Sequence, residues 1–250
     1  MAGLDFTILM SSVVAGATPI LLATLGETIT EKGGLINLSL DGSILLSAMV
    51  AFAVAFETDN LLLGFAAAAI VGALIAATVA LFSLYFGQSQ VAVGFVLTLM
   101  ARDLAYFLGN PYSRLYGSQV TPLPIPVLSK IPILGQIFFN HNPLVYLSMV
   151  LIGFCWWYIY RTPMGLRLRS VGEQPRASYA RGIDPRRLQL FYAVCGGLLV
   201  GLGGASFSLY TKPGWGRPQG AEGTGWVALA LVIFGGWQPL RAAIGAYLFS

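Results

Sequence analysis

Charged residues are scarce in this chain of 250 residues. Only 10% of the residues are Asp, Glu, Lys or Arg, whereas a soluble domain carries about 25%. So few charges cannot cover a water-facing surface, which excludes an ordinary soluble enzyme. The 56% share of hydrophobic residues also excludes a disordered chain. The polypeptide must therefore be solvated mainly by lipid.

Residues that commonly carry chemistry are equally few. The two cysteines, Cys155 and Cys195, lie inside apolar runs, where they fit small buried residues better than a disulfide. With a single histidine, His141, they cannot form a structural zinc site. The sequence contains no Gly-x-x-x-x-Gly-Lys-[Ser/Thr], His-Glu-x-x-His or Gly-x-Ser-x-Gly motif. Asp41 and Asp103 lack the partner motif of an intramembrane protease. We therefore expect no enzyme, no catalytic residue and no metal site.

Long apolar runs predict an all-α, polytopic transmembrane helical bundle that forms one domain over residues 1–250. A spanning helix needs about 20 apolar residues. Six runs reach about that length, namely 6–25, 35–56, 61–86, 91–108, 144–160 and 188–210. The last two apolar stretches, 226–236 and 242–249, are too short for two spans and favour a broken or re-entrant pair. The total is about 7–8 membrane segments.

Small residues recur at helical spacing in two of these runs. The run 61–86 carries Gly72 within a stripe of glycines and alanines spaced four residues apart, and the run 188–210 carries Gly197 and Gly201 as a GxxxG pair. Such stripes let two helix backbones approach closely. We expect them to serve packing within the bundle.

A polar segment separates the first two spans. Residues 26–34 are expected to form a short hinge, and polar residues then alternate with apolar ones through Asn37, Ser39 and Asp41. An open strand cannot face lipid, so this part is either irregular and lines a protein cavity, or helical with Asn37 and Asp41 on one face. Either arrangement keeps Asp41 away from lipid. Its carboxylate then lines a polar solute path or, alternatively, bonds to backbone amides near Gly42.

One loop carries half of all Lys and Arg residues. Residues 161–187 hold seven arginines, and the positive-inside rule places such a loop in the cytoplasm. The N-terminus and the Pro-rich loop 109–142, with a short helix expected near Ile133–Phe139, are then external. Arg102 and Asp103 interrupt the fourth span and are expected near the outer interface, where their side chains reach water.

Within the basic loop, the pattern predicts a two-turn helix over Arg176–Arg181. Pro175 suits the first helical position and Gly182 suits the position after the helix. Such a helix could dock into a groove of a partner protein. The alternative is a solvated basic loop that only fixes the orientation of the chain, and physical arguments alone leave both open.

Three segments resemble a known family of membrane proteins. The stretch 26–42, which runs from Gly-Glu through Gly-Gly-Leu-Ile-Asn-Leu-Ser-Leu-Asp-Gly, resembles a motif of permease subunits of bacterial ABC importers. The stretch 162–177, with Gly182 and Ile183, resembles the cytoplasmic coupling region of these permeases, and 225–246 is similar to their late broken span. The group includes permeases for ribose, branched-chain amino acids and nucleosides. The nucleoside (simple sugar) branch is the most similar.

The resemblance implies a division of labour between chains. Two permease chains, identical or different, surround a central path in the bacterial cytoplasmic membrane. Two ATP-binding subunits dock on the coupling regions, and a solute-binding lipoprotein or periplasmic protein delivers the solute. ATP with Mg²⁺ is then used by the partner ATPase, and this chain binds no cofactor and no nucleic acid. The chain is expected to move a nucleoside or a simple sugar into the cytoplasm by alternating access.

The resemblance also implies roles for named residues. Asn37, Ser39 and Asp41 are expected in the wall of the solute path. The residues expected to couple the chain to the ATPase are Gly172, Glu173, Pro175, Arg176, Ala177, Gly182 and Ile183. Two features depart from the family pattern. Arg102 and Asp103 stand where small or apolar residues are expected, and the chain ends inside an apolar run where related permeases continue, which suggests a C-terminal truncation.

A second hypothesis is a gradient-driven secondary transporter or a channel that works alone. The broken late segment and the buried Asp41 are typical of such proteins. However, we find no repeat between the two halves of the sequence, and this hypothesis leaves the coupling segment unexplained. Dependence of transport on ATP, as opposed to a proton or sodium gradient, distinguishes the two hypotheses.

Overall fold

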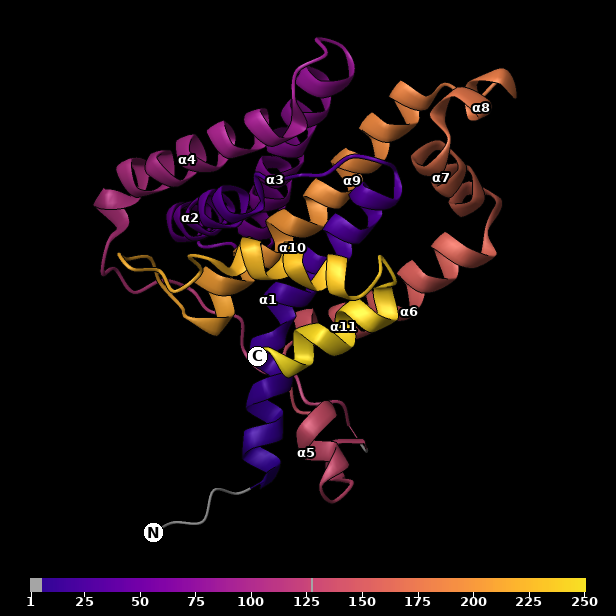
Figure 1. Cartoon of the computed structure of the whole chain (residues 1–250). Coiled ribbons are helices and arrows are strands. Elements are labelled where there is room, and N and C mark those ends of the chain that lie inside the picture. Colours follow the sequence, from indigo (N-terminus) through magenta and orange to yellow (C-terminus); the bar gives the residue numbers. More distant parts are fainter. Residues whose placement is uncertain (1–5, 127) are drawn as a thin grey trace.

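The computed structural model describes residues 6–126 and 128–250, and this part of the chain is built from helices and has no extended strand (Figure 1). Six of the described helices are long and apolar enough to cross a membrane. They are α1 (Phe6–Lys32), α2 (Leu40–Thr58), α3 (Leu61–Leu84), α4 (Gln90–Gly109), α6 (Pro143–Arg161) and α9 (Pro185–Ser206). Helix α4 continues as the 3-10 turn η1 (Asn110–Tyr112), and α9 continues as the π-helical η3 (Phe207–Thr211). The predicted all-α polytopic bundle is confirmed.

Helices α1, α2, α3 and α9 pack together at the centre of the bundle. Glycines make the closest approaches, because a Cβ at Gly72 would collide with the backbone carbonyl of Gly197 on α9. Likewise, a Cβ at Gly201 would collide with the backbone carbonyl of Ala68 on α3. The two predicted stripes of small residues therefore face each other, as close packing of membrane helices requires.

Helix α1 continues through the segment 26–32 that we expected to form a hinge, so this expectation was wrong. The physical reason is that its polar side chains find partners inside the protein; for example, the Thr28 hydroxyl donates to the Thr24 carbonyl of the same helix at 2.7 Å. Gly26 lets α9 approach, since a Cβ there would collide with the α9 backbone. The helix ends at a glycine turn in which Gly34 has a φ of +86°.

The segment 35–39 between α1 and α2 is irregular, and α2 begins at Leu40. The backbone is thus irregular at Asn37 and Ser39, as one of the two predicted arrangements has it, whereas Asp41 lies in the first turn of α2. Asn37, Ser39 and Asp41 are all buried within the protein, so none of them faces lipid, as expected.

Two half-length helices, α10 (Thr224–Phe234) and α11 (Pro239–Leu248), follow one another near the end of the chain. Both residues at the middle of the turn between them have positive φ, +60° at Gly236 and +56° at Trp237. Helix α10 packs against α1 and α2, and α11 packs against α1 and α6 (Figure 1). The predicted broken pair is confirmed.

Short helices lie in the two long loops. The Pro-rich loop 109–142 contains η2 (Leu128–Lys130) and α5 (Leu134–Phe138), and α5 confirms the short helix expected there. The basic loop contains α7 (Pro163–Glu173) and α8 (Pro175–Ala180). Helix α8 confirms the predicted two-turn helix, whereas α7 was not predicted. Figure 1 shows α7 and α8 at the opposite end of the bundle from α5.

Candidate functional site

Asn37 and Ser39 belong to a buried turn between α1 and α2. The Asn37 amide donates to the Glu27 carboxylate on α1 at 2.8 Å. The Asn37 side-chain oxygen accepts hydrogen bonds from the Ser39 amide at 3.1 Å and from the Ser39 hydroxyl, and the hydroxyls of Ser39 and Ser43 are 3.3 Å apart. The polar groups of both predicted path residues thus bond to neighbouring protein groups, which fixes the turn that starts α2.

Asp41 contacts a different element, helix α10. Its carboxylate accepts a hydrogen bond from the Gly225 amide at 3.2 Å, in the first turn of α10, and Asp41 is only 5% exposed. Gly225 allows this approach because a Cβ there would collide with the Asp41 backbone. A carboxylate is favourable at a helix N-terminus, where backbone amides lack partners. Asp41 thus bonds to a backbone amide, as the alternative to a path role supposed, although this amide lies on α10. Asn37 and Ser39, in contrast, bond within the α1–α2 turn.

Aromatic and charged side chains gather where α4 meets the segment before α10. The Tyr106 hydroxyl on α4 donates to the Glu222 carboxylate. The Tyr106 ring centre lies 5.8 Å from the Trp215 ring centre and 4.8 Å from the Arg217 guanidinium. Because Tyr106 makes all three contacts, it joins α4 to the loop that precedes α10.

Glu222 lies outside the candidate spans, in the loop that Tyr106 holds. Partial burial alone would raise the pKa of Glu222, but hydrogen bonds from Tyr106 and from backbone amides favour the ionised carboxylate and outweigh burial. The amides of Gln219 and Gly220 donate to it at 2.8 and 2.7 Å. The pKa of Glu222 is therefore below its usual range, so the carboxylate is negatively charged at neutral pH.

The same side of α4 carries Phe95 and Arg102. The ring centres of Phe95 and Trp226, the latter on α10, are 5.4 Å apart. Arg102 is exposed, and its charge interacts with that of Asp41. Among the described residues its guanidinium has no hydrogen-bond or ion-pair partner. Arg102 therefore remains available to a group outside this chain.

Sequence reasoning placed Arg102 at the outer interface and missed its neighbours. One spacing could have revealed Tyr106, because Arg102 precedes it by four residues within the predicted span. Such spacing places two side chains on one face of a helix. The packing of the bundle brings α4 to Glu222 and Trp226, and no local pattern in the sequence shows these contacts.

The predicted coupling residues lie on α7, on α8 and in the turn that follows α8, and Gly172 packs against the core. A Cβ at Gly172 would collide with the Lys32 carbonyl at the end of α1. Next to this contact, the Gln189 side-chain amide on α9 donates to the Gly33 carbonyl at 2.7 Å. Helices α1, α7 and α9 therefore meet at a point that has no room for a side chain at position 172.

Helix α8 is exposed on nearly all sides. The exposed residues of the predicted coupling set are Glu173, Pro175, Arg176, Ala177 and Gly182. Gly182 has a φ of +81°, and its amide and that of Ile183 donate to the last carbonyls of α8 at 2.9 and 3.1 Å, which is a glycine-type helix end. A groove of about 330 Å³ lies between α7 and α8, lined by Leu166, Ser170, Glu173, Gln174, Ala177 and Ile183 among others. The structure thus brings the predicted coupling residues together in one surface region.

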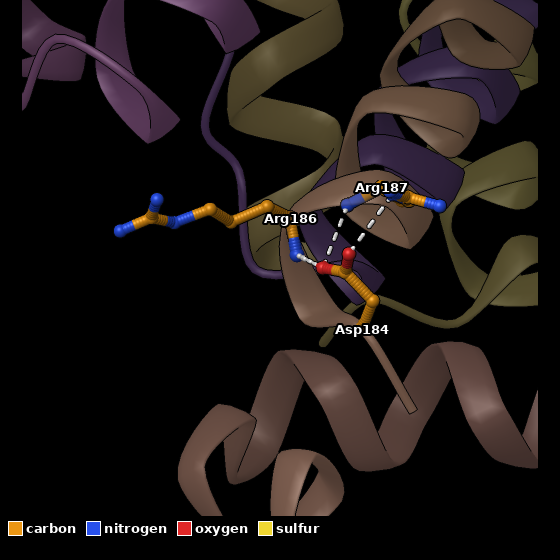
Figure 2. A network of polar contacts seen from close by, with 3 residues as sticks. All are labelled: Asp184, Arg186 and Arg187. Carbon is orange, nitrogen blue, oxygen red and sulfur yellow. Dashed lines mark hydrogen bonds and ion pairs between the residues drawn. The ribbon is translucent and has the colours of Figure 1, made fainter. Parts of the chain in front are cut away.

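Figure 2 shows how the start of α9 is held beside this surface. The Asp184 carboxylate accepts the amides of Arg186 and Arg187 at 3.1 and 3.3 Å, and forms an ion pair with the Arg187 side chain at 3.1 Å. The Arg186 side chain extends away from Asp184 (Figure 2), and its guanidinium lies 5.9 Å from the Tyr85 ring centre. Asp184 therefore caps α9 next to the surface formed by α7 and α8.

Two acidic residues near the end of α1 were also missed as site candidates. Glu27 is fully buried, and Glu31, one turn further, accepts a hydrogen bond from the Trp237 indole in the turn between α10 and α11. The sequence placed both in the expected hinge, whereas their common helix brings them to one face. The Glu31–Trp237 bond joins the end of α1 to the broken pair.

Comparison with known proteins gives consistent matches over nearly the whole chain. Residues 9–250 match the family described as the branched-chain amino acid transport system permease component. A Haloferax volcanii protein named provisionally as a glucose ABC transporter permease is 33% identical, covering 97% of this chain and 74% of that protein. The nucleoside ABC transporter permease of Lactococcus lactis is 29% identical over 97% of this chain and 80% of its own length.

A guanosine ABC transporter permease of Bacillus subtilis is 31% identical, with 97% of this chain and 79% of that protein covered. No solved structure matches the chain. The relatives named here transport different solutes, so the sequence similarity alone does not distinguish a nucleoside from a sugar.

Proposed function

Because the chain belongs to the branched-chain amino acid transport permease family, we propose that it moves a nucleoside or a simple sugar into the cell as the membrane-spanning subunit of an ATP-driven ABC importer. It is a multi-pass membrane protein with six apolar helices among its described residues. In this family ATP hydrolysis belongs to a separate subunit, so the chain itself is not an enzyme.

The exposed coupling surface of α7 and α8 is the observation that carries this proposal. An isolated loop that only fixed orientation would not need Gly172 packed against the end of α1. Nor would it need the groove of about 330 Å³ between the two helices. A short helix held rigidly at one end of a bundle and exposed elsewhere suits docking to a partner protein. The partner we propose is the ATP-binding subunit.

A continuous set of contacts leads from this surface toward the centre of the bundle. Gly172 on α7 touches the Lys32 carbonyl at the end of α1, and Glu27 on α1 bonds to the Asn37 amide. The turn at Asn37 leads into α2, where Asp41 bonds to α10. A movement of α7 would therefore reach the broken pair through packed elements. We propose that ATP binding and hydrolysis use this connection to alternate access to the path.

The partners follow from the same proposal. A second permease subunit, identical to this chain or different, completes the path, and the ATPase uses ATP with Mg²⁺ while this chain binds no cofactor. A solute-binding lipoprotein or periplasmic protein delivers the solute from outside. The seven arginines of residues 161–187 support a cytoplasmic coupling surface by the positive-inside rule, and we propose an external N-terminus accordingly.

Reconstitution of the complete importer in proteoliposomes tests this function. The complex would be purified in mild detergent with its ATP-binding and second permease subunits and supplied with the solute-binding protein. We expect uptake of radiolabelled nucleoside or sugar only when ATP is supplied on the cytoplasmic side of the complex. This uptake should persist when ionophores collapse the proton and sodium gradients. Uptake that stops with ionophores and proceeds without ATP would instead establish the gradient-driven transporter.

A further inference from the structure

Five residues form a surface that we call the α4–α10 face. Phe95, Arg102 and Tyr106 lie on one side of α4, since their spacings of seven and four residues match the helix period. Trp226 and Glu222 lie opposite, where the Phe95 ring meets the Trp226 ring and the Tyr106 hydroxyl bonds to Glu222. Phe95 and Arg102 are exposed, and Tyr106, Trp226 and Glu222 are half-buried. The face therefore combines accessible aromatic rings with charges of both signs.

Arg102 argues against lipid as the cover of this face. It belongs to a candidate span, it is exposed, and among the described residues it has no hydrogen-bond or ion-pair partner. A charged side chain within a span is costly against lipid and is typical of a solute or ion path. Asp41 behind the face offsets part of the charge, but its oxygen is bonded to the Gly225 amide. Arg102 is thus directed to a polar ligand from outside this chain.

We propose that the α4–α10 face is the solute-contact surface of this chain and that its solute is a nucleoside. The proposal rests on the importer function proposed above. The Phe95 and Trp226 rings, with centres 5.4 Å apart, present π-surface to a planar base, as aromatic side chains do for unstacked bases. The Arg102 guanidinium donates hydrogen bonds, and the ionised Glu222 accepts them, which suits the hydroxyls of a ribose.

The length of the face favours a nucleoside over a simple sugar. Arg102 is seven residues from Phe95, or about 10 Å along the helix axis at 1.5 Å per residue. A base stacked on the Phe95–Trp226 pair therefore places its ribose toward Arg102 and Glu222. A single pyranose ring is too short to contact the aromatic pair and the charged pair at once. The solute of this chain is accordingly a two-part molecule with an aromatic end and a hydroxyl-bearing end.

Transport by matched variants of the complete importer tests this assignment. Phe95→Ala removes a ring from the face, and Phe107→Ala removes a 77% exposed ring from the same helix. We expect Phe95→Ala to raise the KM for nucleoside uptake by about tenfold, the scale of losing one base–aromatic contact. Phe107→Ala should keep the native KM and the native ATP-hydrolysis rate without solute. Equal KM values for the two variants would overturn the proposal.

The solute class and the site are tested together by competition and labelling. Unlabelled nucleosides should displace labelled guanosine or adenosine, whereas glucose and ribose should not. A photoreactive azidopurine nucleoside should label peptides containing residues 95–106 or 215–226, and Arg102→Gln should reduce that labelling. ATP-dependent uptake of sugar alone, or labelling confined to residues 35–43, would overturn this proposal and leave the importer function intact. Absence of any ATP-dependent uptake by the assembled complex would overturn the importer function itself.

Discussion

At the scale of single residues, glycine decides how closely helices α3 and α9 approach. A Cβ at Gly197 would collide with the Gly72 carbonyl, whereas a Cβ at Gly153 on α6 has no heavy atom within 4 Å among the described residues. Gly197→Ala should therefore destabilise the protein by about 1–3 kcal/mol, the usual cost of overpacking. Thermal unfolding in detergent should show a midpoint lowered by several degrees.

Gly153→Ala is the matched control because it adds the same methyl group to a helix where there is space. Alanine forms helices better than glycine, so its unfolding midpoint should be equal to that of the native protein or slightly higher. Equal midpoints for Gly197→Ala and Gly153→Ala would show that α9 can shift without cost and would contradict the close packing described above.

Asp41 offers a second test at this scale, because its two proposed roles respond differently to substitution. Asn keeps an oxygen that can accept the Gly225 amide, whereas Ala removes it. If Asp41 chiefly caps α10, as its bond indicates, Asp41→Asn should keep native stability and uptake. Asp41→Ala should lose about 1 kcal/mol, as removal of a helix cap does. If Asp41→Asn instead abolishes uptake while its stability stays native, the carboxylate belongs to the solute path.

At the scale of elements, helix α8 is the part whose surface and fold can be tested separately. Ala177 is exposed, so Ala177→Arg adds bulk and charge to the docking surface without disturbing a core. Gly182 has a φ of +81°, which proline cannot adopt, so Gly182→Pro disrupts the end of α8. We expect both variants to abolish ATP-dependent uptake while the chain stays in the membrane and its spans stay folded.

Ala177→Ser is the control for the α8 variants, since it changes the same position with little added bulk and should transport normally. Co-purification in mild detergent measures docking directly, and Ala177→Arg should lose the ATP-binding subunit from the complex. Normal uptake by both Ala177→Arg and Gly182→Pro would remove the coupling role from α8 and return this segment to a solvated basic loop.

At the scale of the whole molecule, the spans could be predicted because lipid requires every spanning segment to be apolar and long enough to cross the membrane. The apolar runs, the short late pair and the two glycine stripes all follow from length and composition. The segment 26–32 could not be predicted, because several of its polar residues, such as Thr28 and Glu27, find partners only within the folded bundle. For the same reason the α4–α10 face was missed: it unites residues more than 100 positions apart, such as Tyr106 and Glu222.

The link between Glu31 and Trp237 connects the coupling end of α1 to the broken pair, and it gives a prediction for the assembled importer. Trp237→Phe removes the indole N–H that donates to Glu31 but keeps an aromatic ring. We expect ATP hydrolysis to persist while the amount of solute moved per ATP falls, because a polar contact that joins α1 to the broken pair would be lost. Trp157→Phe, at a 51% exposed tryptophan of α6, is the matched control. Equal ratios of transport to ATP hydrolysis in the two variants would show that the Glu31–Trp237 bond does not carry the movement.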